Sequence, residues 1–170
     1  MKALVLEPLG MKDSTYEQPL PAALTGRAAR AHDINGHRLD VPWNIMPELA
    51  AAGLWTTPTD LARFMIDVQK SLSSQSNVVL SQRTAEEMVT PVGIGPFAVG
   101  FTIEKRGQGW YFGHNGGNVG YQSTALAHRA KGYGVIVMTN SDNGRVLVDE
   151  IVTRVARAYG WDTLDKELVQ

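Results

Sequence analysis

The sequence predicts an α+β fold in which an antiparallel sheet of about four strands packs against a C-terminal helix, with a helical and loop-rich N-terminal half. Three observations predict it. A helix start signal near residue 57 precedes apolar residues at helical spacing. Between residues 96 and 141, short β-prone runs alternate with glycine-containing turns, a pattern typical of an antiparallel meander. After residue 142 the apolar residues return to helical spacing.

Residues 1–46 are expected to be rich in loops. Glu7-Pro8 and Leu20-Pro21 interrupt the chain, and Asn35-Gly36 between two short runs favours a tight hairpin turn. Little regular structure is therefore expected in this part.

Residues 47–95 are expected to be helical. Thr57 can cap a helix, Pro58 suits its first position, and Asp60 suits the positive end of the helix dipole. A second short helix is expected over residues 81–89. The apolar residues of the first helix that share one face are Leu61, Phe64, Met65 and Val68.

Four strands are expected in residues 96–141, and a helix in 142–160. The strand-like runs cover residues 97–104, 110–114, 123–128 and 133–139. The third run ends at His128, which is expected to face solvent. Asp142 or Asn143 can cap the final helix, whose apolar stripe should pack on the sheet.

Composition excludes several classes of function. The 170 residues are 44% hydrophobic and carry a net charge of −1, so no nucleic-acid surface is indicated. No apolar run reaches the length of a membrane span, and the absence of cysteine excludes a disulfide framework. The spacing of His32 and His37 matches no metal signature, so a surface loop is favoured there and neither metal nor other cofactor is expected.

A histidine followed by glycines is the most distinctive motif. In Phe112 to Tyr121, His114 precedes Asn115-Gly116-Gly117, and glycines allow a backbone to approach a ligand closely. The motif therefore has two readings from its residues alone. It is either a site for an anionic or carbonyl-bearing substrate, or a hairpin connection with an exposed histidine. The tryptophans are interpreted as core or cleft wall because no basic residues interleave with them: Trp43, Trp55 and Trp110.

Four ordered blocks resemble the serine β-lactamase-like family, which includes class C β-lactamases, D,D-peptidases (penicillin-binding proteins) and related esterases. The blocks are residues 7–11, 47–64, 112–121 and 135–140. The resemblance covers nearly the whole chain and implies a single partial domain over residues 1–170 with part of the β-lactamase/transpeptidase-like fold. It also suggests a periplasmic or secreted location.

The resemblance assigns roles to the histidine motif. His114-Asn115-Gly116 matches the family's third signature, in which the cation or imidazole orients the substrate and moves protons. The backbone N–H of Gly117 would form half of the oxyanion hole. His114 and Gly117 are therefore the expected catalytic residues, and Asn115, Gly116 and Tyr121 the expected substrate-binding residues.

The sequence departs from the family at the nucleophile. The family uses Ser-x-x-Lys, and no serine in these 170 residues has lysine three positions later. Ser141-Asp142-Asn143 spells a known signature, but it follows the histidine motif instead of preceding it and is interpreted as a helix cap.

Two functions remain open at this stage. The first is the C-terminal part of a serine hydrolase that transfers acyl groups to water, with a small-molecule or peptide-like acyl substrate. The alternative is a noncatalytic fragment or binding module that keeps half of the cleft. Either an N-terminal complementing chain or a homo-oligomer through strand 133–139 is expected, because that apolar strand would be left as an edge. The sequence does not distinguish peptidase, esterase and β-lactamase substrates.

Overall fold

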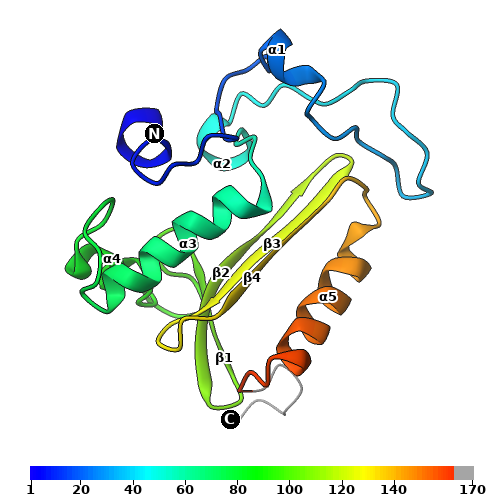
Figure 1. Cartoon of the computed structure of the whole chain (residues 1–170). Coiled ribbons are helices and arrows are strands. Elements are labelled where there is room, and N and C mark those ends of the chain that lie inside the picture. Colours follow the sequence, from blue (N-terminus) through cyan, green and yellow to red (C-terminus); the bar gives the residue numbers. More distant parts are fainter. Residues whose placement is uncertain (163–170) are drawn as a thin grey trace.

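The computed structural model describes residues 1–162 and shows one antiparallel sheet between two helices (Figure 1). The sheet has the order β1-β2-β3-β4, so β1 and β4 are its edges. The strands are β1 Thr102–Arg106, β2 Gly109–Asn118, β3 Tyr121–His128 and β4 Gly134–Thr139. The α-helices are α1 Ala22–Thr25, α2 Leu49–Ala52, α3 Pro58–Leu72, α4 Gln82–Met88 and α5 Gly144–Ala158.

Each face of the sheet has its own apolar core, because successive strand residues point to opposite faces. Phe112 of β2 packs with Met65 and Val68 of α3 on one face. Its neighbour Tyr111 packs with Val148 of α5 on the other. The expected packing of the C-terminal helix on the sheet is confirmed.

The starts of α3 and α4 follow the sequence signals. Thr57 Oγ1 accepts a 3.2 Å hydrogen bond from the Asp60 amide, and Pro58 is the first residue of α3. Ser81 caps α4 in the same way. Both signals are local, so tertiary contacts did not need to be known in order to find these helices.

The glycine-rich motif is a strand and not the expected turn. β2 continues through Asn118, and the chain reverses only at Val119 and Gly120. Gly120 has φ +80°, and a Cβ there would lie 2.4 Å from Cβ of Ala31. Gly120 alone provides the space and the positive φ that the reversal requires. Gly116 and Gly117 are therefore not needed for the turn and lie within β2.

The first expected strand also starts later than predicted. Phe97 forms only an isolated bridge with Thr102, and β1 begins at Thr102. Gly100 between them has φ +80°, a value outside the extended region, so the chain bends there.

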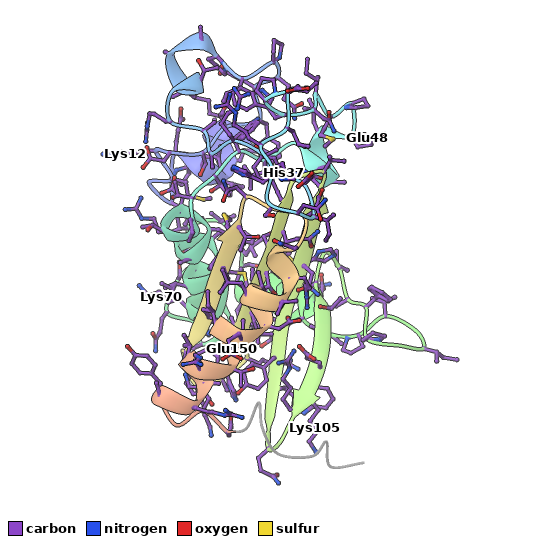
Figure 2. The ribbon with its side chains drawn as sticks, turned by 90° about the vertical axis from the view of Figure 1, so that its right-hand side faces the viewer. Lys12, His37, Glu48, Lys70, Lys105 and Glu150 are labelled. Atoms are coloured by element: carbon purple, nitrogen blue, oxygen red, sulfur yellow. The ribbon has the colours of Figure 1, made fainter. Side chains whose placement is uncertain are left out.

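The N-terminal loops cover one end of the sheet, and the β1–β2 connection lies at the other. Figure 2 shows His37 and Glu48 near the first end and Lys105 near the second. The expected Asn35-Gly36 turn is present, with the Asp33 amide donating to the His37 carbonyl at 2.9 Å. The part called loop-rich also contains a short π-helix, Lys2–Leu6, which the sequence did not indicate.

The predicted capping of α5 is wrong. Asn143 occupies the cap position without a side-chain cap and donates instead to the Ile34 carbonyl at 3.0 Å. Asp142 Oδ1 accepts from the Gly120 amide at 2.6 Å, and the Ser141 hydroxyl donates to the Asp33 carbonyl at 3.0 Å. These long-range hydrogen bonds replace the local cap and join three loops.

His128 is buried, with 4% of its surface exposed, although the sequence predicted that it would face solvent. The chain after α5 returns to the end of the sheet, where the ring of Trp161 stacks on Tyr133 at 4.7 Å between centroids. Asp162 follows and approaches His128 Nε2 at 3.4 Å. The sequence around His128 gives no sign of this covering segment, which follows more than 30 residues later.

No helix among residues 1–162 is long and apolar enough to cross a membrane.

Candidate active site

β2 extends five residues beyond its pairing with β1. The last β1–β2 pair is Thr102 with Gly113, whereas β3 accompanies β2 as far as Asn118. Residues 114–118 therefore have a strand neighbour on one side only, within the described part of the chain. The other side is an open edge.

The backbone of Gly117 is directed to this open edge. The Thr102 hydroxyl donates a 3.0 Å hydrogen bond to the Gly113 carbonyl, which places the Gly113 peptide groups on the β1 side. Peptide groups alternate sides along a strand, so those of Asn115 and Gly117 lie on the β1 side as well. Their amides can donate to a carbonyl oxygen placed against the edge.

The His114 side chain lies on the face that carries α3, two residues after Phe112, and is exposed. Its Nδ1 lies 2.6 Å from the Asn115 carbonyl oxygen, so an N–H at Nδ1 can donate to that oxygen. In the neutral tautomer that makes this hydrogen bond, Nε2 carries the lone pair. His114 can accept a proton from a group on the α3 side.

A hydroxyl that the sequence analysis missed shares this face. Ser123 pairs with Gly116, and a Cβ at Gly116 would lie 2.5 Å from Ser123 Oγ. Gly116 therefore leaves room for the serine side chain. Strand alternation counted back from Ala125, the partner of His114, would have placed Ser123 here.

Asn115 and Gly117 have their side-chain positions on the opposite face, which carries α5. The Thr124 hydroxyl donates to Asn115 Oδ1 at 2.7 Å and orients this amide on that face. The predicted catalytic groups therefore lie in two different places on β2. His114 presents its side chain on the α3 face, and Gly117 contributes its amide at the edge between the faces.

Tyr121 is held within the packing of the N-terminal loops. Its hydroxyl donates to the Ala29 carbonyl at 2.8 Å, and its ring lies edge-on to Trp55 at 6.4 Å. Burial raises the pKa of Tyr121 above its usual value. Its Cα pairs with Asn118, four residues beyond His114. Tyr121 shares the α3 face with His114 but is separated from it along the strand.

Two of the tryptophans that were expected to line a core or cleft, Trp43 and Trp110, lie in different surroundings. Trp43 lies edge-on to Trp55 at 5.2 Å, consistent with the core or wall that was expected. Trp110 is 47% exposed, near the β1–β2 connection, and forms no part of that wall.

The two imidazoles of the N-terminal loops contact other groups. His32 Nδ1 lies 2.9 Å from the Asn140 carbonyl, and His37 is exposed beside Asp33. Hydrogen bonds from the His37 and Asn35 amides lower the pKa of Asp33, with the His37 amide dominant. No three metal-binding side chains gather anywhere in residues 1–162.

Comparison with known proteins identifies the family. The sequence model of the beta-lactamase family matches residues 1–159. The chain belongs to the beta-lactamase family. No curated protein sequence matches it significantly.

Solved structures share the fold of this beta-lactamase family chain at low sequence identity. The structure titled SurE has a TM-score of 0.73 at 21% identity, with 99% of this chain and 41% of that chain covered. The octameric penicillin-binding protein homologue from Pyrococcus abyssi has a TM-score of 0.70 at 21% identity, with 98% and 38% covered. D-amino acid amidase from Ochrobactrum anthropi SV3, complexed with D-phenylalanine, has a TM-score of 0.68 at 22% identity, with 92% and 52% covered.

These matches confirm the expected fold. The chain spans about two fifths to half of the length of these structures. It carries the four-stranded antiparallel sheet with its C-terminal helix, which is part of the β-lactamase-like fold.

Proposed function

We propose that this chain supplies the oxyanion-binding and histidine half of a serine hydrolase active site. The observation that carries the proposal is the open edge of β2. Within residues 1–162 the Gly117 amide has no strand partner on this side, and the exposed His114 lies three residues earlier. The reaction is acyl transfer to water through an acyl-serine. The expected substrates are small-molecule or peptide-like acyl compounds with an amide, ester or β-lactam bond.

The positions of the Gly117 amide and the His114 imidazole support this chemistry. A substrate carbonyl lying against the open edge can accept a hydrogen bond from the Gly117 amide, and such donors stabilise the negative oxygen that forms when a nucleophile adds. The serine oxygen bonds to the carbonyl carbon and its proton passes to a base. The base returns this proton to the leaving group as the carbonyl re-forms, which gives the acyl-serine. Water then adds to the acyl carbon, and the acid and the free serine hydroxyl are released. His114 Nε2 is placed to take part in proton transfer on the α3 face.

The serine itself must come from another segment. Ser-x-x-Lys does not occur in the printed sequence, and the matched structures extend well beyond the part that this chain spans. Because the His114 imidazole lies on the α3 face, the complementing segment is expected to present its serine there. A segment outside the printed residues, on the same or on another polypeptide, therefore completes the site in the active form.

The comparisons support hydrolysis of an amide bond as the chemistry of the proposed site. Titles of matched structures name a D-stereospecific amidohydrolase, a D-amino acid amidase and a penicillin-binding protein homologue. Histidine at the position of His114 agrees with the peptidase and esterase members that the sequence resembles. The alternative is a noncatalytic module that binds ligands or partners through the same half-cleft.

The test is isolation of the protein from the cells that produce it, through a tag at the C-terminus of the protein. The intact mass of every polypeptide in the preparation is measured, and the preparation is treated with a fluorophosphonate. Hydrolysis of p-nitrophenyl acetate, D-phenylalanine amide and a chromogenic β-lactam is followed in parallel. We expect hydrolysis of at least one substrate, with the label on a serine of Ser-x-x-Lys outside residues 1–170.

Two results would contradict the proposal. Stoichiometric labelling of a serine or threonine within residues 1–170 would show that the chain supplies its own nucleophile. A native preparation that neither reacts with the probe nor hydrolyses any substrate would favour the noncatalytic module.

A further inference from the structure

Arg30, in the N-terminal loops, presents a half-buried guanidinium to the surface. No carboxylate in the described part of the chain lies within ion-pair distance of it, whereas Arg27, three residues earlier, pairs with Asp13 at 2.5 Å. Nε of Arg30 is buried and has no acceptor among residues 1–162. The terminal nitrogens keep contact with the surface. This guanidinium is therefore partly desolvated and still open to an anionic ligand.

Aromatic rings lie beside the Arg30 guanidinium. Its Cζ is 6.0 Å from the centroid of the Trp43 ring, a cation–π distance. Trp43 lies edge-on to Trp55, which in turn lies edge-on to Tyr121. Burial raises the pKa of Tyr121, and the charge of Arg30 acts in the opposite direction, so this charge is felt at the tyrosine. Both indoles are partly exposed, so a ligand at Arg30 can contact them as well.

One side chain of β3 positions the two loop segments that carry Arg30 and Trp43. The Tyr121 hydroxyl donates to the carbonyl of Ala29, the residue before Arg30, at 2.8 Å. The same hydroxyl lies 3.4 Å from the carbonyl of Pro42, the residue before Trp43. The cation and its aromatic neighbour are thus fixed to the sheet before any ligand binds.

The Arg30 segment lies beside the end of β2 that carries the candidate active site. Ala31, the next residue, packs so closely on Gly120 that a Cβ there would lie 2.4 Å from Cβ of Ala31. Gly120 follows Gly117 by three residues, and a strand advances about 3.3 Å per residue. The segment therefore lies on the order of 10 Å from the Gly117 amide, within the reach of one extended substrate molecule.

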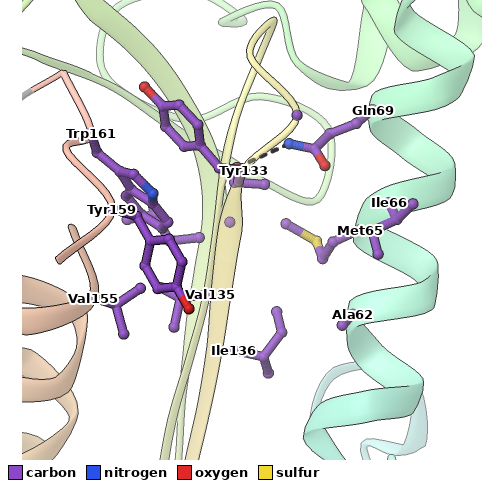
Figure 3. A pocket seen from close by; sticks show the side chains of 14 residues that line it. Ala62, Met65, Ile66, Gln69, Tyr133, Val135, Ile136, Val155, Tyr159 and Trp161 are labelled. Atoms are coloured by element: carbon purple, nitrogen blue, oxygen red, sulfur yellow. Dashed lines mark hydrogen bonds between the residues drawn. The ribbon is translucent and has the colours of Figure 1, made fainter.

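The apolar hollow elsewhere in the molecule offers no such contact. A cavity of about 400 Å³ between α3 and α5 is lined by side chains such as Ile66 and Val155 and, within residues 1–162, by no charged one (Figure 3). Its amide side chain, Gln69, already donates to the carbonyls of His128 and Tyr133 at 2.8 and 3.1 Å. An anionic ligand would lose its hydration there without gaining a cation.

We infer that Arg30 binds a carboxylate of the substrate and that Trp43 and Trp55 contact the apolar part next to it. A guanidinium donates two parallel hydrogen bonds to a carboxylate, and partial burial strengthens this pairing because the fold has already removed part of its hydration. The favoured substrates are then acyl compounds with an anionic group on the order of 10 Å from the scissile carbonyl.

The inference rests on the proposed function for the identity of the reaction, but binding of the anion does not require hydrolysis. Binding is therefore measured without turnover. An inactive native preparation would count against the proposed function and still allow Arg30 to be tested.

The first measurement is the binding of benzoate to the isotopically labelled native preparation, with benzamide as the matched neutral ligand. The two ligands share the ring and nearly the same shape, so the difference between them reports the charge. Nuclear magnetic resonance follows the side-chain N–H signals of Arg30, Trp43 and Trp55. We expect benzoate to shift the signals of Arg30 and Trp43 in a saturable way. Benzamide should bind about 10-fold more weakly or worse, because it lacks the charged hydrogen bonds.

The second measurement compares esters that differ only in charge. Mono-p-nitrophenyl esters of linear dicarboxylic acids of increasing length are hydrolysed beside their neutral methyl esters. We expect kcat/KM of the acid to exceed that of its methyl ester by about 10–100-fold at the chain length that reaches Arg30, with little advantage for the shortest acids. O-acetyl hydroxy acids carry the carboxylate in the leaving group and are compared with their methyl esters in the same way, because a substrate can approach the edge in either direction.

Three variants assign the preference to Arg30. Arg30→Gln should bring the kcat/KM values of the charged and neutral esters together, mainly through a higher KM for the charged one. Arg30→Lys keeps the charge without the planar fork and should retain part of the preference. Arg27→Gln is the matched control, since it removes a neighbouring cation that is already paired, and it should leave the preference unchanged.

Three results would overturn the inference. The first is equal binding of benzoate and benzamide. The second is equal kcat/KM for charged and neutral esters at every length in both series. The third is an unchanged preference in Arg30→Gln with the circular dichroism spectrum intact, which would place the anion site elsewhere. A preparation that hydrolyses none of these esters would contradict the proposed function, and the benzoate titration would still decide whether Arg30 binds a carboxylate.

Discussion

The hydroxyl of Tyr111 in β2 donates a 2.8 Å hydrogen bond to Oδ1 of Asp162, which lies 51 residues later and beyond α5. Tyr133 donates to the same carboxylate, and Lys131 Nζ lies 2.6 Å from its other oxygen. Burial alone would raise the pKa of Asp162, but these three donors outweigh burial and hold the pKa well below its usual value. The segment that follows α5 is thereby fixed to the end of the sheet.

Asp162→Asn should lower the free energy of unfolding at pH 7 by about 1–3 kcal/mol. The substitution keeps the side-chain volume but removes the negative charge to which three groups donate hydrogen bonds. It also replaces one acceptor oxygen with a donor NH2 group. Urea denaturation followed by circular dichroism measures the change. Asp149→Asn is the control, since its carboxylate is 58% exposed in a surface ion pair and should matter by less than about 0.5 kcal/mol. Equal losses in the two variants would contradict this role of Asp162.

Acidification should destabilise the protein in two steps, and His128 accounts for the first. Burial is the dominant cause that lowers the pKa of His128 below 6.5. Its Nδ1 accepts from the amides of Ala130 and Lys131 at 2.9 and 2.8 Å, so protonation there would break both bonds. The unfolded chain then binds the proton more readily, and stability falls as the pH drops below about 6.5. The slope cannot exceed about 1.4 kcal/mol per pH unit for one proton.

Asp162 accounts for the second step. Its pKa in the folded protein is lower than in the unfolded chain, so its contribution is complete above about pH 4 and is lost below. Urea denaturation from pH 7 to pH 3 measures both steps. His128→Gln should flatten the curve between pH 7 and 5 and leave the decline below pH 4. An unchanged slope between pH 7 and 5 in this variant would rule out His128 as the first group.

Local signals predicted the helices well and the strand limits less well. The α3 start could be found because Thr57, Pro58 and Asp60 act within one helical turn. His128 was predicted to be exposed because the residues that bury it follow α5. No local sequence pattern indicates that these residues pack on the sheet. Asp142 and Asn143 were misassigned for the same reason, since they bond to loops far away in the sequence.

The site was predictable as a motif but not as a geometry. The residues around His114 indicated a ligand-accessible backbone, and the structure has an open edge at these residues. The direction of the Gly117 amide depends on the Thr102–Gly113 register, which sequence alone does not fix. Ser123 was missed because its relation to Gly116 also follows from register.

Gly120→Ala should destabilise the protein more than Gly132→Ala, by about 1–3 kcal/mol. Both glycines have positive φ, +80° and +75°, so the backbone strain of the two variants is similar. Only at Gly120 would the new Cβ collide with Ala31, whereas Gly132 faces open space. Chemical denaturation of the two variants gives the difference directly. Similar stabilities would mean that the loop around Ala31 moves freely, contrary to the hydrogen bonds that hold it.

His114→Ala should lower kcat of the native preparation by about 10²–10⁴, the usual contribution of a positioned acid or base. His37→Ala is the matched control, because His37 is also exposed but lies in an N-terminal hairpin remote from β2 in the sequence. Steady-state kinetics on the substrate identified for the native protein provide the measurement. Unchanged turnover in the His114 variant would make the imidazole a surface group without a role in the reaction.

Gly117→Pro tests the backbone amide without altering any side chain of the site. Proline is tolerated on a strand edge whose N–H faces outward, so the melting temperature should change little. The variant lacks the donor that would face the substrate carbonyl, and the loss of one such donor lowers kcat by about 10²–10³. Gly117→Ala retains the amide, and its Cβ would meet Gln122 at an ordinary 3.5 Å, so its loss of kcat should be about 10²-fold smaller. If the two variants lost activity equally with the fold intact, the oxyanion would have to lie elsewhere, and the open edge of β2 would serve only to bind.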